Sequence, residues 1–200
     1  MLDVYLTRHG KTIWNTQERM QGRDNSPLTQ EGIQDAHKLK TRLLPFDFTG
    51  CFTSPMPRAV HTSLILIGDR SVPLFFEDSL SEMALADWEG VLVEDAKKSD
   101  PERFYNFRNR PELYVPSANG EDFRQVVCRA QTFLDKLALL PPDMTPILGV
   151  THCILLQAIV MLCDKRPLST LRSGQEVLQT TLFHIRLSDE GIWSVIERNS

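Results

Sequence analysis

The chain has 200 residues, of which 42% are apolar and 24% are charged, a balance typical of a globular protein. A chain of this length buries enough apolar surface to fold as one domain without covalent or metal staples. Its net charge of −4 gives no electrostatic footprint for nucleic acid. No run of about 18 apolar residues is present that could span a membrane. We therefore expect a single domain over 1–200 whose partners include neither nucleic acid nor a membrane.

The cysteines are scattered, with no Cys-x-x-Cys pair and no His/Cys cluster at zinc spacing. The first apolar run begins at residue 3 or 4, which leaves no room for a signal peptide. Both observations favour reduced thiols and a cytoplasmic location. The four thiols belong to Cys51, Cys128, Cys153 and Cys163.

Short runs rich in β-formers alternate with helical patterns along the chain. The first strand is expected at 4–7, followed by a helix over 33–43 with Thr29 as its start signal and Pro45 as its stop. Further strands are expected at 51–53, 74–77, 147–151, 181–187 and 192–196, and further helices at 58–67, 123–140 and 154–163. Strands that alternate with helices predict an α/β domain with a mainly parallel sheet. The last two strands are separated by Ser188-Asp189-Glu190-Gly191, a hairpin signal that makes the sheet mixed.

The stretch 88–120 breaks this alternation. It contains Asp100-Pro101, Arg110-Pro111 and Val115-Pro116, together with several aromatic and basic side chains. Proline ends helices and restricts the residue before it, so short helices and loops are expected here. We expect an insert over the sheet edge that acts as a lid.

Charged and polar side chains follow several of the predicted strands. Arg8 and His9 follow the first strand, Arg58 opens the helix after the second, Glu82 follows the third, and His152 follows the strand at 147–151. Open α/β sheets bind ligands at the carboxyl ends of their parallel strands. Arginine binds phosphate or carboxylate oxygens in bidentate fashion, and histidine can attack phosphorus or carry a proton. These residue types predict an anion-binding site with a nucleophile at this edge.

The sequence around these residues resembles the histidine phosphatase superfamily, also called phosphoglycerate mutase-like. The matching fragments, in this order, are Arg8-His9-Gly10 with Thr12, Trp14 and Asn15, the run from Gln21 to Gly32, Ser54-Pro55-Met56-Pro57-Arg58-Ala59, Glu82 with Trp88-Glu89-Gly90, and Thr151-His152. The resemblance covers nearly the whole chain. It implies a three-layer α/β/α sandwich with a mixed, mainly parallel sheet and a small, partly helical lid.

The resemblance also implies a catalytic cycle in which His9 is phosphorylated on a ring nitrogen. Arg8, Arg58 and a protonated His152 would hold the phosphoryl group, and Glu82 would donate and accept the proton. A backbone carbonyl bonded to the other ring N–H of His9 would fix the tautomer that attacks. No metal and no cofactor would be needed. The implied substrate-binding residues are Asn15, Gln21, Gly22 and Cys153.

Several positions stay open at this stage. Lys11 and Cys153 depart from the family pattern, and a cysteine after His152 could tighten the pocket or make it sensitive to oxidation. Arg108 and Arg110 in the insert are equally compatible with substrate contact and with a solvated face.

The reaction expected is metal-independent hydrolysis of a small-molecule phosphomonoester. The alternative within the family is a cofactor-dependent phosphoglycerate mutase. Its members carry a longer insert and a C-terminal tail, whereas this sequence stops at Ser200, soon after its last predicted strand. A non-catalytic phospho-ligand binding module and a metal hydrolase using His9 and His152 are weaker alternatives. The substrate and the oligomeric state stay open, a homodimer being one option.

Overall fold

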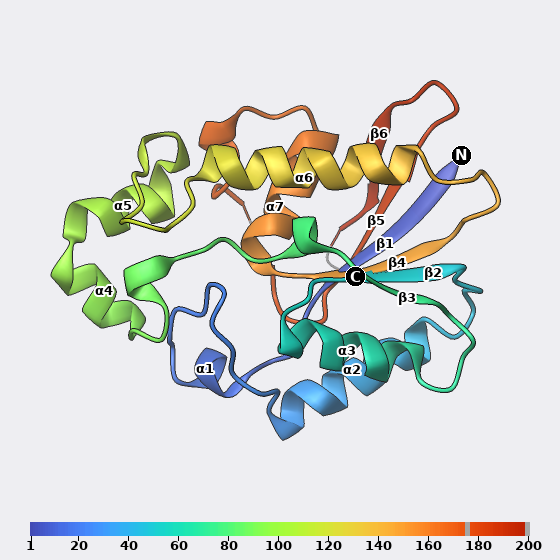
Figure 1. The fold of residues 1–200 in the computed structure, drawn as a ribbon, viewed down its shortest axis with the longest axis horizontal. Coiled ribbons are helices and arrows are strands. Elements are labelled where there is room, and N and C mark those ends of the chain that lie inside the picture. The colour runs from blue at the N-terminus through green and yellow to red at the C-terminus, as the bar shows by residue number, and fades with distance from the viewer. Residues whose placement is uncertain (175–176, 199–200) are drawn as a thin grey trace.

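The computed structural model describes residues 1–174 and 177–198. Six strands form one sheet in the order β3-β2-β4-β1-β5-β6 (Figure 1). The four strands β3, β2, β4 and β1 are parallel to one another, while β5 pairs antiparallel with both β1 and β6. The mixed, mainly parallel sheet predicted from the sequence is therefore confirmed. The strands are β1 (Leu2–Arg8), β2 (Gly50–Thr53), β3 (Leu74–Phe76), β4 (Ile147–Thr151), β5 (Leu182–Leu187) and β6 (Trp193–Glu197).

Helices cover both faces of the sheet, which gives the three-layer α/β/α arrangement. Helices α2 (Gln30–Arg42) and α3 (Pro57–Ile67) lie on one face, and α6 (Phe123–Ala138) and α7 (Cys153–Cys163) lie on the other (Figure 1). Thr29 caps α2 by accepting a hydrogen bond from the backbone of Gly32, as its place before the helical pattern predicts. The remaining short elements are α1 (Ile13–Thr16), α4 (Val93–Ser99), α5 (Pro101–Asn109) and the 3-10 turns η1 (Asp78–Leu80), η2 (Ala86–Trp88), η3 (Pro111–Leu113) and η4 (Leu168–Thr170).

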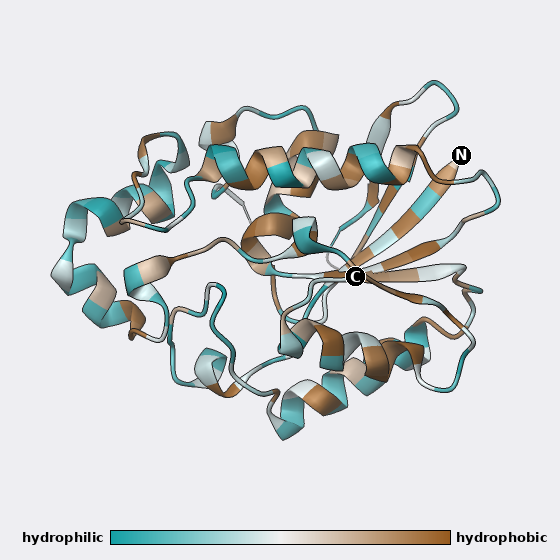
Figure 2. Ribbon diagram, in the orientation of Figure 1, coloured by the Kyte–Doolittle hydropathy of each residue, from teal (hydrophilic) through white to brown (hydrophobic). Residues whose placement is uncertain are grey.

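The sheet separates two hydrophobic cores. The larger core packs α6 and α7 against the sheet and includes Leu6, Phe133 and Leu155, all fully buried. The smaller core packs α2 and α3 against the other face and includes Leu66 and Leu148. Hydrophobic residues accordingly gather on the strands and on α7 (Figure 2). Every residue of β4 is buried, because this strand pairs on both edges and carries a helical layer on both faces.

The segment 88–120 forms α4, α5 and η3, which lie beyond the carboxyl ends of the parallel strands (Figure 1). Aromatic side chains join it to the main body: the ring of Trp88 lies 5.5 Å from that of Phe107, which lies 5.7 Å from that of Phe123 on α6. The guanidinium of Arg103 sits over Trp88, 4.2 Å from the ring centroid. The short helices and loops expected for this segment are thus present, and the aromatic contacts fix it against α6.

Candidate active site

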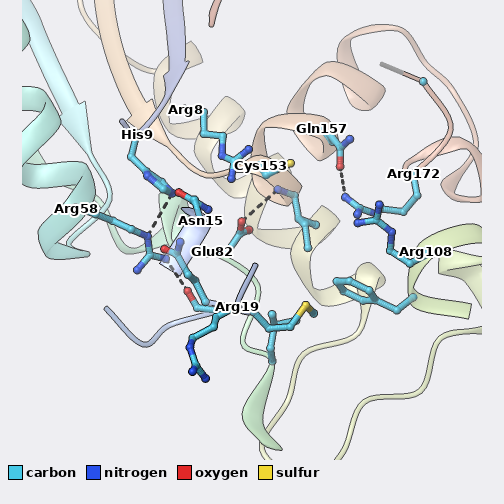
Figure 3. Close-up of a pocket in the computed structure, with 17 residues that line it drawn as sticks. Arg8, His9, Asn15, Arg19, Arg58, Glu82, Arg108, Cys153, Gln157 and Arg172 are labelled. Carbon is cyan, nitrogen blue, oxygen red and sulfur yellow. Dashed lines mark hydrogen bonds between the residues drawn. The ribbon is translucent and has the colours of Figure 1, made fainter. Parts of the chain in front are cut away.

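A pocket of about 260 Å³ is lined by Arg8 and His9 at the carboxyl end of β1 and by Phe107 and Arg108 of the segment 88–120. Its lining comes from the end of β1, the loop before Gly22, the start of α3, the segment after η1, α5, α7 and the segment after η4 (Figure 3). Of the nine site residues expected from the sequence, all but His152 line this pocket: Arg8, His9, Asn15, Gln21, Gly22, Arg58, Glu82 and Cys153.

His9 stands directly after β1 and is only 3% exposed. Its Nδ1 lies 2.8 Å from the carbonyl oxygen of Gly10. A carbonyl can only accept, so Nδ1 carries the proton and Nε2 keeps its lone pair. This is the tautomer expected from the sequence. The amide of Gly10 donates to Thr62 Oγ1 at 3.0 Å, which ties the turn after His9 to helix α3.

Burial lowers the pKa of His9 well below its ordinary value, and the positive charges of Arg58 and Arg8 act in the same direction. The imidazole is therefore neutral at pH 7. A neutral ring with a free Nε2 is the form that can attack phosphorus.

Arg58 opens helix α3 and is almost completely buried. Its Nε donates to His9 Nε2 at 3.3 Å, so the guanidinium lies beside the attacking nitrogen (Figure 3). The other end of the fork donates to the carbonyls of Asp24 at 2.6 Å and Gly22 at 2.7 Å. Burial lowers the pKa of Arg58 to about 10, which leaves the group charged at neutral pH. Arg58 is thus a fixed cation whose position is set before any ligand binds.

Arg8 supplies the second guanidinium on this side of the pocket. Its Nη1 donates to the carbonyl of Val177 at 2.7 Å, which anchors the side chain to the segment before β5. Its Nε is buried and has no protein acceptor within the described part of the chain. A donor left unpaired in a buried position is costly, and an oxyanion in the pocket would satisfy it.

Glu82 lies across the pocket from His9 and is 8% exposed (Figure 3). One carboxylate oxygen accepts from the backbone N–H of Met83 at 2.9 Å, and the other accepts from that of Ile154 at 3.3 Å. These two bonds come from separate segments and hold the carboxylate toward the cavity. The arrangement suits a group that exchanges a proton with a bound ester.

His152 differs from its expected role. It is fully buried, does not line the pocket, and lies behind Arg58, with its ring centroid 5.1 Å from that of His9. Its Nδ1 accepts from Arg58 Nη2 at 3.3 Å, so the ring proton is on Nε2, which donates to Ser54 Oγ at 2.7 Å. Burial and then the charge of Arg58 lower its pKa well below the ordinary value. The structure thus favours a neutral His152, whereas the sequence analysis expected this ring to be protonated around a bound phosphoryl group, and that expectation stays a prediction.

Asn15 and Gln21 are organised around Thr12. The side-chain oxygen of Asn15 accepts from both the amide and the hydroxyl of Thr12, each at 3.0 Å, so it completes the capping box of α1 as well as lining the pocket. Gln21 donates to Thr12 Oγ1 and keeps its own Oε1 buried without a partner in the described structure. Gly22 follows with φ +52°, and a Cβ there would lie 2.2 Å from a carboxylate oxygen of Glu89. That turn therefore requires glycine.

Of the four positions left open by the sequence, two line the pocket and two do not. Lys11 pairs with Glu31 at 2.8 Å outside the pocket, whereas Cys153 lines it with a half-buried thiol. Arg108 lines the pocket, but Arg110 does not and instead lies over the ring of Tyr105.

Sequence reasoning missed three polar pocket residues, Arg19, Gln157 and Arg172. Arg19 is held by the carbonyl of Gly90 at 2.7 Å. Arg172 donates to Gln157 Oε1 at 2.6 Å. None of the three belongs to a motif. The only available signal for Gln157 was its position as the one strongly polar residue within the apolar helix α7.

Within 1–174 and 177–198, no group of three His, Cys, Asp or Glu side chains lies together as metal ligands do. No helix formed by those residues is both long and apolar enough to cross a membrane.

A neutral imidazole with a free nitrogen, two fixed guanidiniums and an opposed carboxylate define a phosphoryl-transfer site on an α/β/α fold. The guanidiniums match the charge that spreads over the oxygens of a transferring phosphoryl group.

Comparison with known proteins agrees with a phosphoryl-transfer site on this fold. The sequence pattern of the histidine phosphatase superfamily (branch 1) matches residues 4–200, and the chain belongs to this superfamily. It is 29% identical over 196 residues to the adenosylcobalamin/alpha-ribazole phosphatase of Escherichia coli (strain K12), covering 98% of this chain and 90% of that protein. It is 32% identical over 165 residues to a probable phosphoglycerate mutase, GpmB, of Escherichia coli O139:H28, covering 80% and 74% of the two chains. The solved structure of Bacillus stearothermophilus YhfR superposes with a TM-score of 0.91 at 34% identity, over 98% of this chain and 96% of that one. The resemblance and the fold class expected from the sequence are both confirmed.

Proposed function

We propose that the chain is a metal-independent phosphatase that hydrolyses a small-molecule phosphomonoester through a phosphohistidine on His9. The observation that carries the proposal is the state of His9, which is buried, neutral and unprotonated at Nε2, with Arg58 donating to that nitrogen and Glu82 across the pocket. Membership of the histidine phosphatase superfamily supports the same reaction.

In the first step, Nε2 of His9 attacks the phosphorus and the bond to the ester oxygen breaks. The leaving alkoxide takes a proton from Glu82, so the alcohol departs neutral. Arg8 and Arg58 neutralise the phosphoryl oxygens, and the Nδ1–H bond to the Gly10 carbonyl stabilises the positive charge that develops on the ring. Because both guanidiniums are already anchored by backbone carbonyls, little reorganisation is needed during transfer.

In the second step, a water molecule attacks the phosphorus of phosphohistidine. Glu82, now ionised, accepts the proton of the water as the P–N bond breaks, and inorganic phosphate forms. His152 acts in this proposal through Arg58, since its Nδ1 accepts from that guanidinium and its Nε2–H is fixed by Ser54. Asn15, Gln21, Gly22 and Cys153 are assigned to the wall of the phosphate pocket.

The segment 88–120 is proposed to act as a lid within a single domain over 1–200. The last turn of α5, with Phe107 and Arg108, reaches the pocket, while aromatic contacts fix the segment to α6. A cytoplasmic location fits the four cysteines, all of which are unpaired thiols.

The proposal is tested by a phosphate-release screen in excess chelator. Phenyl phosphate, 3-phosphoglycerate and α-ribazole 5′-phosphate are the first compounds to assay, the last because of the similarity to alpha-ribazole phosphatases. Wild type should release phosphate from at least one of them and form an acid-labile phosphoenzyme, and His9→Ala should do neither. Near-normal activity in His9→Ala would refute the mechanism.

A phosphoglycerate mutase is the second candidate, because of the similarity to GpmB. Exclusive 2-to-3 isomerisation of phosphoglycerate, dependent on bisphosphoglycerate and without phosphate release, would favour that activity over hydrolysis.

A further inference from the structure

The half of the pocket remote from His9 contains two further guanidiniums. Arg108 comes from the last turn of α5, and Arg172 comes from the segment after η4. Figure 3 shows them together at the end of the pocket opposite Arg8, His9 and Arg58, with Glu82 and Cys153 in between. The pocket therefore has two cationic ends.

Arg172 is held in place by its neighbours but keeps one unpaired N–H donor. Its Nη1 donates to Gln157 Oε1 at 2.6 Å, and its Cζ lies 5.4 Å from the centre of the Phe107 ring. Its Nε is buried and has no acceptor within 1–174 and 177–198. An amide and an aromatic ring thus orient this guanidinium, while one of its N–H groups has no protein acceptor. Such an arrangement suits the binding of an anion.

The charge balance of the pocket also favours the binding of an anion at this remote end. Five arginines line it, whereas Glu82 is its only carboxylate among the described residues. Neither Arg108 nor Arg172 forms an ion pair in the described structure. Burial lowers the pKa of Arg172 and the like charge of Arg108 acts in the same direction, while Cys153 and the carboxylate of Glu82 act in the opposite direction. Since Arg8 and Arg58 already match one phosphoryl group, Arg108 and Arg172 are further cations that a site for a single phosphoryl group does not require.

We propose that Arg108 and Arg172 form a second anion subsite that selects phosphomonoesters with another anionic group, a carboxylate or a second phosphate, at the end remote from the scissile ester. The inference rests on the proposed function. Gln157 is a positioning residue for Arg172, and Met20, Leu85 and Ile154 give the intervening part of such a substrate apolar contacts.

The test uses ω-phosphooxy carboxylic acids of increasing chain length, their methyl esters, and the corresponding diol bisphosphates. Acid and ester share size and leaving group and differ in one negative charge. A charge-assisted contact contributes about 1.5–3 kcal/mol, so at the best length wild type should favour acid or bisphosphate over ester by about tenfold or more in kcat/KM. The ratio of acid to bisphosphate tells which anionic group the subsite takes.

Two variants each remove one guanidinium of the subsite, and a third variant serves as a matched control. Arg172→Gln and Arg108→Gln should each lower kcat/KM for the acid far more than for the ester and so abolish the preference, and a urea midpoint equal to that of wild type shows that each variant is folded. Arg110→Gln removes an equal charge from the same segment outside the pocket and should keep the preference. Equal turnover of acid, bisphosphate and ester by wild type, or a preference that survives in both subsite variants, would overturn the inference.

Binding to His9→Ala separates this inference from the proposed function. That variant cannot be phosphorylated on residue 9, so titration calorimetry with the acids and esters measures the subsite without turnover. Tighter binding of the acid, lost when Arg172→Gln is added, supports the subsite even if no ester is hydrolysed. Equal affinities for acid and ester refute it even if hydrolysis is efficient.

Discussion

Lowering the pH from 6.5 to 5 should destabilise this protein strongly, because two histidines are buried in their neutral form. His9 and His152 both have pKa values held well below the ordinary value of 6.5 by burial and by neighbouring guanidiniums. In the unfolded chain both rings regain ordinary values and take up protons in this range. The unfolded state then binds more protons than the folded state, so the free energy of unfolding falls as pH falls.

The size of the effect follows from linkage. A group whose folded pKa is lowered loses about 1.4 kcal/mol of stability for each pH unit below its unfolded pKa, until the folded pKa is reached. Two such groups lose roughly 3 kcal/mol between pH 6.5 and 5, a large part of the 5–15 kcal/mol typical of a domain. The carboxylates with lowered pKa values, such as Asp3, Glu77 and Glu121, add to the loss of stability only at lower pH. Between pH 6.5 and 5 the loss therefore comes from the histidines.

Urea denaturation at several pH values in phosphate-free buffer measures this loss directly. The slope of unfolding free energy against pH should fall by about half in His9→Gln and nearly vanish in His9→Gln/His152→Gln. Replacement of an exposed histidine, His61→Gln, should leave the slope as in wild type. Parallel profiles for wild type and the double variant between pH 6.5 and 5 would refute the assignment of both rings as buried and neutral.

Three further changes test other parts of the site. Glu82→Gln should lower kcat by about 10²–10⁴ for alkyl esters and much less for 4-nitrophenyl phosphate, whose leaving group needs no proton; equal losses for both would contradict a proton-donor role. Ser54→Ala leaves Nε2–H of His152 buried without an acceptor and should lower the free energy of unfolding by about 1–3 kcal/mol in urea titrations. Gly32→Ala places a Cβ 2.2 Å from the carbonyl oxygen of Lys11, so the turn after the nucleophile must shift. We expect about 1–3 kcal/mol of destabilisation together with a lower kcat, and unchanged values for both would show that the helix yields without moving that turn.

The sequence predicted the layered fold because its strands carry unusually direct signals. Parallel strands buried on both faces read as continuous apolar runs, and β4 is such a run. Helix α6 shows a clear apolar stripe, and α2 has Thr29 at its start. Two of the differences are that the short helix α1 was not expected, and that β3 ends at Phe76, where the next side chain, Glu77, caps η1 by accepting from the backbone of Ser79.

Local patterns indicated pocket residues at the end of a strand or at the start of the helix that follows it, and the family resemblance indicated the others. Arg8, His9 and Arg58 occupy such places, and local patterns indicate their positions. Arg172 reaches the pocket from an irregular segment, so its contribution depends on tertiary packing that no local pattern records. The outcome for Arg108 and Arg110 depended on where α5 ends: the first lies in its last turn and faces the pocket, and the second is already past the helix.

The contact between Arg58 and His9 has a consequence for the order of events in the pocket. The lone pair that accepts the Nε–H of Arg58 is the same one that forms the bond to phosphorus. Once that bond forms, the donor loses its acceptor at the moment when phosphoryl oxygens arrive beside it. Arg58 can therefore exchange one acceptor for another without an interval in which the buried N–H is unsatisfied. The reverse exchange occurs when water releases the phosphate, so the same bond restores the free site for the next substrate.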